Sequence, residues 1–462
     1  MLEKIIHLFK DALSGKEEKF TTGSIRRAIM LLSVPMVIEM IGEGVFALVD
    51  AFFVSRISTA AVTTIGLIET VATLIYSLAI GISIAATATV ARRVGEEKLK
   101  EAAEAGVQAI WLSGFIAFVI AITGVYFADD ILWLLSKDEE VVAVGTGYTR
   151  LLFGSNIVIV LLFVLNGVFR GAGNASMAMK SLWIANGLNI ILDPLLIFGV
   201  GFFPELGLLG AAVATTIGRG VGVLFQLYIL FNGGSIIKMS WEHFKIIPET
   251  IKKMANVATT GALQFAVASC SWIFVAGIIA DLGKDVFAGY TFAIRLIIFA
   301  ILPAWGIANA AATLVGQNLG AKQPERAEAS VWKAGFYNAV FMGAIGIVFF
   351  IFAEPLISIF STEKIVLETG VLCLRIFCLG NVFYSYGMVM GQAFGGAGDT
   401  RTPTIINLIC FWMIEIPLAY FLAIVLDYGV LGAMLAIIGA ESILAVIAIL
   451  IFKQGKWKTV EI

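Results

Sequence analysis

Residues 35–55, PMVIEMIGEGVFALVDAFFVS, have the length and apolar character of a membrane-spanning helix but contain three acids. An α-helix turns about 100° per residue, so Glu39, Glu43 and Asp50, spaced four and then seven positions apart, share one face. A charge at bilayer depth costs about 2.5 kcal/mol or more, and such acids normally face a protein interior or a water-filled cavity. The stretch therefore predicts a spanning helix whose carboxylate face lines a cavity.

The composition indicates a polytopic membrane protein. Of the 462 residues, 60% are hydrophobic and only 14% are charged, and the mean hydropathy is +0.96. A net charge of -2 gives no indication of a nucleic-acid partner. The four cysteines lie in apolar runs without a CxxC pair, and neither histidine has a partner at ligand spacing, so we expect no disulfide, no metal cluster and no cofactor.

Twelve apolar segments are long enough to cross a bilayer, which requires about 20 residues. They predict an all-α membrane protein with two six-helix lobes, residues 28–231 and 257–452, joined by a linker at 232–256 that we expect to form an interfacial helix. A lead-in at 1–27 and a tail at 453–462 complete the chain. The predicted spans are residues 28–54, 62–91, 105–127, 144–169, 177–199, 207–231, 257–280, 287–317, 331–353, 368–393, 402–425 and 430–452.

Basic residues predict the orientation, because cytoplasmic segments carry an excess of Lys and Arg. The N-terminus, the segments after even-numbered spans and the C-terminus hold 23 of the 31 Lys and Arg, and the opposite side holds four. We therefore expect a multi-pass protein of the cell (inner) membrane with both termini in the cytoplasm.

The two lobes are repeats of one another. A shift of 225 positions aligns Gly95 with Gly320, and Gly171-Ala172-Gly173 with Gly396-Ala397-Gly398. Near the end of each lobe the shift becomes 222, where GLLGAAVA at 207–214 meets GVLGAMLA at 429–436. Six is an even number of spans, so both lobes have the same orientation and are related by an axis along the membrane normal.

A second polar face lies in the predicted fifth span. Asn186, Asn189 and Asp193 are three and four positions apart, and Pro194 weakens the backbone ladder beside the acid. Asp193 and Asp50 both fall in the outer half of their spans, so they could meet in one cavity. Close like charges cannot both ionise freely, and a shared site would take up a proton or a hard cation. The alternative is a polar stripe that only holds two helices together.

Other ionisable residues inside the spans have competing interpretations. Glu69 lies at a depth similar to that of Asp50, which makes it a candidate for substrate binding, whereas Arg219 is more typical of structural pairing. Glu415 and Glu441 are further intramembrane acids. Residues 396–399, GAGD, match the GxGD of intramembrane aspartyl proteases, but their repeat partner GAGN lacks the acid, which favours a turn.

The chain resembles the multidrug and toxic compound extrusion (MATE) family over residues 25–452. The resemblance rests on FALVDAFFVSRI in the first span, VARRVG after the second, FRGAGN after the fourth, NIILDP in the fifth and GAAVAT in the sixth. It implies a non-enzymatic carrier, a V-shaped bundle that alternates access between two faces and expels cationic or amphiphilic compounds in exchange for H⁺ or Na⁺.

The resemblance also implies roles for particular residues. The prokaryotic members coupled through the amino lobe place their acid of the first span on Asp50, and their fifth-span asparagine and aspartate on Asn189 and Asp193. Their sixth-span threonine falls on Thr215 and a fourth-span tyrosine on Tyr148. Two departures are Glu39 and Glu43, which are additional acids, and the lack of acids in the seventh and tenth spans, where Gln264 and Tyr384 are found.

The sequence thus predicts a secondary active antiporter, expected to be a monomer in the lipid bilayer. The rivals are a lipid-linked oligosaccharide flippase of the same superfamily, which would present cations to a pyrophosphate, and an intramembrane protease. The residues expected to bind H⁺ or Na⁺ are Asp50, Asn189, Asp193 and Thr215, and those expected to bind small cationic or amphiphilic substrates are Glu39, Glu43, Glu69, Tyr148 and Asn186.

Overall fold

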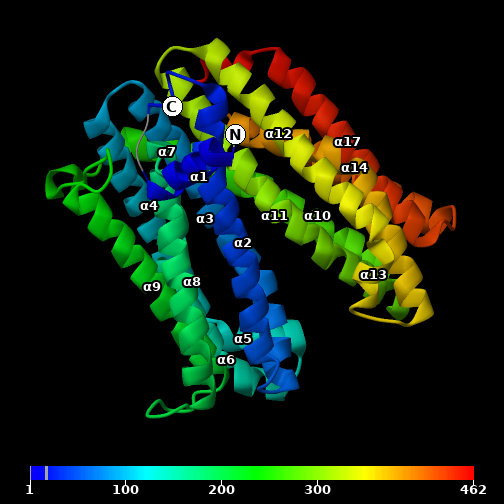
Figure 1. The fold of residues 1–462 in the computed structure, drawn as a ribbon. Helices are drawn as coiled ribbons and strands as arrows, with labels where there is room; N and C mark the ends of the chain where they lie inside the picture. Colours follow the sequence, from blue (N-terminus) through cyan, green and yellow to red (C-terminus); the bar gives the residue numbers. More distant parts are fainter. Residues whose placement is uncertain (1, 16–18) are drawn as a thin grey trace.

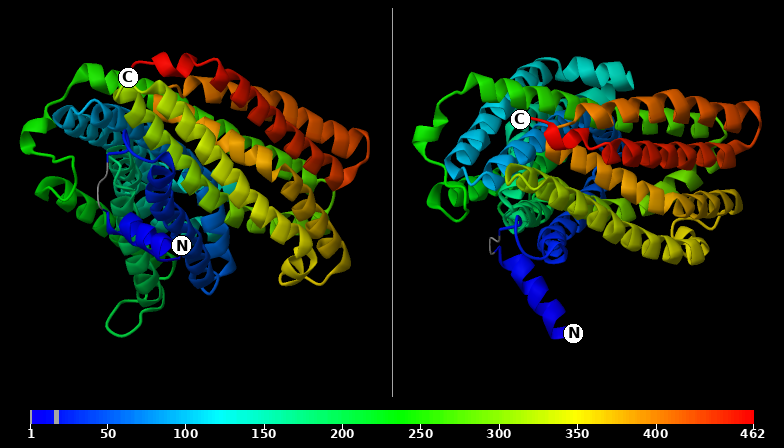
Figure 2. Two further views of the ribbon diagram at one scale, coloured as in Figure 1. Left: turned by 45° about the horizontal axis from the view of Figure 1, so that its top comes forward. Right: turned by 90° about the horizontal axis from the view of Figure 1, so that it is seen from above.

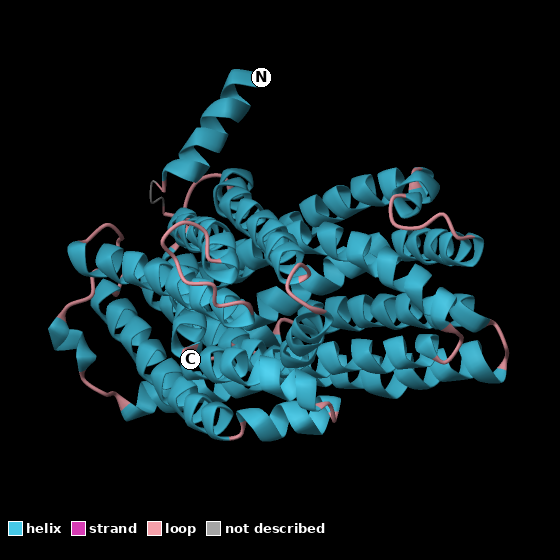
Figure 3. Ribbon diagram, turned by 90° about the horizontal axis from the view of Figure 1, so that it is seen from below, coloured by secondary structure: helices cyan, strands magenta, loops and turns pink. Residues whose placement is uncertain are grey.

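The computed structural model describes residues 2–15 and 19–462. Within these residues the chain contains helices and connecting loops but no strand (Figure 3). An amphipathic helix precedes the first bundle, and the second bundle follows a loop that contains a single 3₁₀ turn. The helices up to that loop are α1 (Leu2–Ser14), α2 (Ile25–Val54), α3 (Thr59–Gly95), α4 (Leu99–Tyr126), α5 (Ala128–Ser136), α6 (Glu139–Gly154), α7 (Asn156–Ala172), α8 (Ala175–Phe198) and α9 (Leu208–Asn232).

The second bundle repeats this order. The connecting loop contains the 3₁₀ turn η1 (Trp241–Phe244). The helices that follow it are α10 (Pro248–Ala280), α11 (Lys284–Gly320), α12 (Pro324–Ile351), α13 (Ala353–Ser358), α14 (Lys364–Ala397), α15 (Arg401–Asn407), the π-helical η2 (Leu408–Glu415), α16 (Ile416–Tyr420), the π-helical η3 (Phe421–Val425), α17 (Gly429–Lys453) and the 3₁₀ turn η4 (Lys456–Thr459).

The predicted twelve-helix architecture is confirmed. Ten helices of the described chain are long and apolar enough to cross a membrane, or eleven if α6 and α7, bent by 43°, form one span. The remaining predicted span is α2, a helix of 30 residues that carries the three acids. The expected interfacial helix at 232–256 is wrong, because residues 241–244 form a short 3₁₀ turn and α10 already begins at Pro248.

The predicted eleventh span is one continuous helix, Arg401–Val425, but it contains two π-helical segments, η2 and η3. Pro417, just after η2, has no backbone N–H, and its ring would clash with the carbonyl four residues earlier in a regular α-helix. π turns are frequent at functional sites. They place Glu415 at the junction between η2 and α16.

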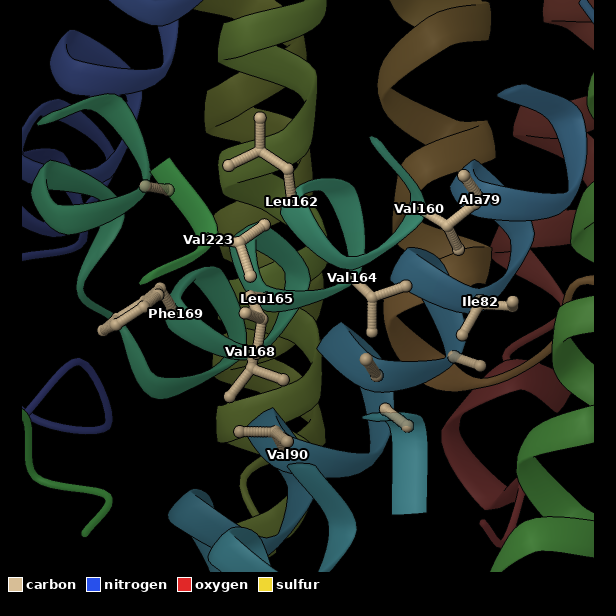
Figure 4. Packing of buried hydrophobic residues seen from close by; sticks show 14 of the residues in the cluster. Ala79, Ile82, Val90, Val160, Leu162, Val164, Leu165, Val168, Phe169 and Val223 are labelled. Carbon is tan, nitrogen blue, oxygen red and sulfur yellow. The ribbon is translucent and has the colours of Figure 1, made fainter. Parts of the chain in front are cut away.

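Each lobe is held together by apolar packing. In the first lobe, Ile82 and Val90 of α3 pack with Leu165 and Phe169 of α7 and with Val223 of α9 in one buried cluster (Figure 4). The polar residues of α2, α8 and α9 are not part of this apolar cluster and lie in a separate group.

The two lobes interlock at the end of the molecule that carries both termini, and their helices diverge toward α5, α6 and α13 (Figures 1 and 2). At the interlock a Cβ on Gly95 would overlap the carbonyl oxygen of Gln317, and a Cβ on Gly320 would overlap that of Arg92. Because 92 and 317 are themselves 225 apart, these two contacts are related by the repeat.

The N-terminal half of α2 belongs to the same interface. Leu32 and Met36 are buried in one cluster with Ala308 and Ala311 of α11, and Gly306 lies directly against the backbone of Met36. The rest of α2, which carries the acids, packs against α8 of its own lobe. One helix therefore connects the interlock to the polar residues of the first lobe.

Candidate functional site

The three acids of α2 have three different environments. Glu39, nearest the interlock, is completely buried, with its side chain paired to Arg170 of α7. Asn166 donates to the same carboxylate oxygen at 3.3 Å, and its own oxygen accepts from Gln226 at 2.6 Å and from Ser181 at 3.4 Å. A hydrogen-bonded network of α7, α8 and α9 thus holds Glu39, although its Oε2 atom has no hydrogen-bond partner in the described chain.

Glu43, one turn further, is paired with Arg219 of α9. Arg219 Nη1 lies 2.8 Å from Glu43 Oε1 and Nη2 lies 3.3 Å from Oε2, a two-point contact. Asn186 of α8 also donates to Oε1, at 3.4 Å, and the guanidinium lies over the ring of Phe46 at 5.1 Å. The structural pairing predicted for Arg219 is therefore present.

Asp193, Asn189 and Thr215 form the polar contact between α8 and α9. With its nitrogen toward Asp193, the Asn189 amide donates to Asp193 Oδ2 at 2.8 Å. Its oxygen then accepts from the Thr215 hydroxyl at 3.1 Å and from the Thr215 backbone N–H at 2.9 Å. Asp193 is completely buried, and its Oδ1 atom has no hydrogen-bond partner in the described chain.

Asp50 lies close enough to Asp193 for the two carboxylates to interact electrostatically. Asp50 is partly buried and also interacts electrostatically with Glu69 of α3 and with Arg219. The sequence analysis placed Asp50 and Asp193 in one neighbourhood from their depth alone, and in the structure they lie within range of electrostatic interaction.

Tyrosines and Glu69 surround this pair of aspartates. Tyr148 is half-buried and interacts electrostatically with Asp50, Glu69 and Asp193. Glu69 itself is exposed. Tyr76 of α3 interacts with Asp50, Glu69, Glu43 and Arg219, a neighbour that the sequence analysis did not single out.

Arg170 is the second residue that the sequence analysis missed. It lies within the FRGAGN motif, where its neighbours suggested a turn at the cytoplasmic end of a span. An indication was available, because a buried acid as deep as Glu39 requires a partner and Arg170 is the basic residue nearest the end of the predicted fourth span.

The GAGD motif of residues 396–399 is a turn, as predicted. Gly398 has φ +88° and ends α14 in the left-handed conformation, which glycine adopts without a steric penalty. Asp399 then accepts from the Thr402 backbone N–H at 3.1 Å and from its hydroxyl at 2.7 Å. The Asp399 carboxylate therefore accepts hydrogen bonds from the first turn of α15, as expected of a turn and not of a catalytic pair of acids.

No group of three or more His, Cys, Asp or Glu side chains in the described chain could hold a metal ion. The ligands expected for Na⁺ include the amide of Asn189 and the hydroxyl of Thr215, whose oxygens are of the type that hard cations prefer. Carboxylate, amide and hydroxyl oxygens gathered between spanning helices, in one of two repeated lobes, define a membrane transporter.

Comparison with known proteins specifies the family. The MatE profile matches residues 35–195 and again residues 261–421, once in each repeat. The chain therefore belongs to the MatE, or multidrug and toxic compound extrusion, family, whose members are transporters and not enzymes.

Relatives and solved structures cover almost the whole chain. A probable multidrug resistance protein NorM of Thermotoga maritima is 28% identical over 98% of this chain and 96% of its own length. The FAD transporter of Shewanella oneidensis is 27% identical over 89% of this chain and 91% of its own. A solved outward-facing conformation of a multidrug resistance MATE family transporter has a TM-score of 0.89 at 26% identity, covering 95% of this chain and 97% of that chain.

Proposed function

We propose that this protein is a secondary active antiporter that exports cationic or amphiphilic compounds in exchange for H⁺ or Na⁺. Relatives over nearly its full length carry names of multidrug resistance or export proteins, which supports the cargo class. Both lobes belong to one chain, so a monomer in the inner membrane suffices for alternating access.

The placement of Asp50 and Asp193 within range of electrostatic interaction is the observation that carries the proposal. No basic side chain is paired with either carboxylate in the described chain, although Arg219 lies within electrostatic range of Asp50. Two neighbouring carboxylates away from bulk water are stable only when a proton or a cation neutralises part of their charge. Uptake of the coupling ion by Asp50 and Asp193, with Asn189 and Thr215 as neutral ligands, follows from this requirement.

The substrate competes with arginines in this scheme. Glu43 and Glu39 are the acids proposed to attract a cationic substrate, and in this conformation they are paired with Arg219 and Arg170. A bound cation would therefore take over a carboxylate from an arginine. Tyr148, Asn186 and Glu69 would supply the aromatic and polar contacts beside it.

The position of the interlock indicates to which side of the membrane this conformation is open. The lobes meet at the end that carries the termini (Figure 1), which the distribution of basic residues places in the cytoplasm. We infer that the structure is open toward the outside, where Asp50 and Asp193 would receive the coupling ion.

Export of anionic cargo, by a flippase of lipid-linked sugars or by a carrier like the FAD transporter, is the alternative. Such a cargo needs free cations in the binding region. Arg170 and Arg219, the basic residues in contact with the acids of α2, are both paired with carboxylates, which favours cationic cargo.

Transport by purified protein in proteoliposomes tests the proposal. A proton or a sodium gradient is imposed separately, with the membrane potential clamped by K⁺ and valinomycin, and efflux of a fluorescent cation is followed. We expect one of the two gradients to drive efflux, and Asp50→Asn and Asp193→Asn to abolish it while Glu354→Gln, an exposed acid of the second lobe, does not. Gradient-driven efflux that is unchanged in both aspartate variants would remove the pair from the mechanism.

A further inference from the structure

The second lobe contains a pair of buried carboxylates that the proposed mechanism does not use. Glu415 at the end of η2 is 2% exposed and Glu441 of α17 is 7% exposed, and the two interact electrostatically. Neither has an ion pair or a hydrogen bond within the described residues. Their neighbours in the apolar core of the lobe offer no compensating charge.

Glu415 lines a small cavity. The cavity has a volume of about 10 Å³, room for about one water molecule, and Val275, Ile294 and Ile437 contribute to its mostly apolar wall. The Oε2 atom of Glu415 is buried and has no hydrogen-bond partner in the described chain. An unpaired carboxylate oxygen thus lies at a space large enough for a proton and its water.

By the internal repeat, this cavity is equivalent to the region around Asp50 and Asp193 in the first lobe. Gly210 packs on the carbonyl of Leu196, and Gly432 packs in the same way on that of Leu422. These contacts relate α8 to the α15–η3 span by 226 positions and α9 to α17 by 222.

With these shifts Glu441 and several residues that line the cavity correspond to polar residues around Asp50 and Asp193 in the first lobe. Glu415 takes the place of Asn189, Ile437 that of Thr215 and Glu441 that of Arg219, and at the shift of 225 Val275 takes that of Asp50 and Ile294 that of Glu69. The second lobe therefore retains acids in the equivalent region, but at different positions and in drier surroundings.

We propose that Glu415 and Glu441 form a second proton-binding site, in which the pair holds at least one proton within the second lobe. Burying two carboxylates without a cation costs far more than burying a neutral acid next to a carboxylate. The titratable groups that interact with the pair are Tyr384 of α14, Tyr290 of α11 and Cys410 of η2, and α10 contributes the uncharged Trp272 and Val275. None of these groups is a cation.

The cavity favours a proton over a metal cation. A metal ion needs several oxygen ligands at once, whereas Glu415 and Tyr290 are the only residues with a side-chain oxygen among those that line the cavity in the described chain. A proton needs only one carboxylate oxygen and one water molecule. This assignment does not depend on Asp50 or Asp193, which lie in the other lobe.

Infrared spectroscopy of the purified full-length protein tests the proposal directly. A carboxyl group protonated in apolar surroundings absorbs above the carboxylate and amide bands, and the band shifts in D₂O. We expect the double variant Glu415→Gln/Glu441→Gln to lose at least one carboxyl equivalent of this band at neutral pH, while Glu354→Gln keeps the wild-type amplitude. An unchanged band in the double variant would overturn the proposal, as would a band that Na⁺ removes from the wild-type protein at constant pH.

A second measurement uses the wild-type protein and so does not depend on the folding of the variant. Dicyclohexylcarbodiimide modifies protonated carboxyls in apolar surroundings, and peptide mass mapping locates the products. We expect adducts at Glu415 or Glu441 that decrease at least fivefold from pH 6 to pH 10, without protection by Na⁺. Absence of both adducts while Asp50 or Asp193 is labelled would also overturn the proposal.

Discussion

Glu43 of α2 and Arg219 of α9 form a two-point ion pair, with N–O distances of 2.8 and 3.3 Å. Arg219 is almost completely buried, so its charge is compensated mainly by this contact. The pair connects the acidic face of α2 to the helix that carries Thr215. It therefore joins an acid that we propose to attract substrate to the helix that carries a proposed ligand of the coupling ion.

Removal of the arginine tests this link. Arg219→Gln leaves a carboxylate without its counter-charge, and breaking a buried pair in this way costs about 3 kcal/mol. We expect a lower thermal unfolding temperature in detergent together with a lower KM for a cationic dye, because the competitor for Glu43 is gone.

An exposed ion pair is the matched control. Asp129 and Arg150 are 2.8 Å apart but both side chains are about half exposed, and such pairs contribute at most about 1 kcal/mol. Asp129→Asn should leave both unfolding temperature and KM near the wild-type values. An Arg219→Gln effect no larger than that of Asp129→Asn would show that the buried pair is unimportant.

Resistance in a drug-sensitised host checks the coupling residues separately. Asp50→Asn should be expressed and inserted but confer no resistance, because the neutral amide cannot exchange one bound cation for another. Glu69→Gln, on the exposed side of the same cluster, should retain part of the resistance with a changed drug spectrum. Glu140→Gln, in an exposed helix start, serves as the control, and wild-type resistance in the Asp50 variant would exclude that residue.

The spans and the repeat could be predicted because they depend on local hydropathy and constant spacing. Asp50 and Asp193 could be placed in one neighbourhood because both lie at similar depth in neighbouring helices of one lobe. These properties are fixed by chain position and by the bilayer thickness, and they need no knowledge of side-chain packing.

The partners of the acids could not be predicted in the same way. Glu39 and Glu43 share a helical face, yet Glu39 faces Arg170 of α7 and Glu43 faces Arg219 of α9, which depends on how three helices pack. The π segment that ends at Glu415 could likewise not be predicted from Pro417, because Pro35, Pro194 and Pro303 lie inside α-helices. Pair contacts of this kind are properties of the tertiary structure, so sequence spacing alone cannot assign them.

The amide of Asn189 should couple Asp193 to Thr215. Asn189→Ala removes the donor to Asp193, and Thr215→Val removes the hydroxyl that donates to the amide. In a double-mutant cycle on the apparent affinity for the coupling ion, we expect an interaction free energy of about 1 kcal/mol. Strictly additive effects would show that the three side chains do not act as one site.

The glycine interlock should control which face of the protein is open. A methyl group on Gly95 would overlap the carbonyl oxygen of Gln317, and one on Gly320 would overlap that of Arg92, so either alanine forces the lobes apart at the end that carries the termini. We expect Gly95→Ala and Gly320→Ala to lengthen the distance between spin labels at Lys100 and Glu325, measured by pulsed dipolar spectroscopy with accessible native cysteines replaced by serine.

The control for the interlock is Gly343→Ala of α12, where the added methyl meets no atom within 4 Å. It should leave the distance distribution unchanged and stabilise the helix by about 1 kcal/mol at most. Because the two interlock contacts are related by the repeat, both alanine variants should shift the same distance in the same direction. A shift in only one of them would mean that the two halves of the interlock open independently, in contradiction to rigid rocking of whole lobes.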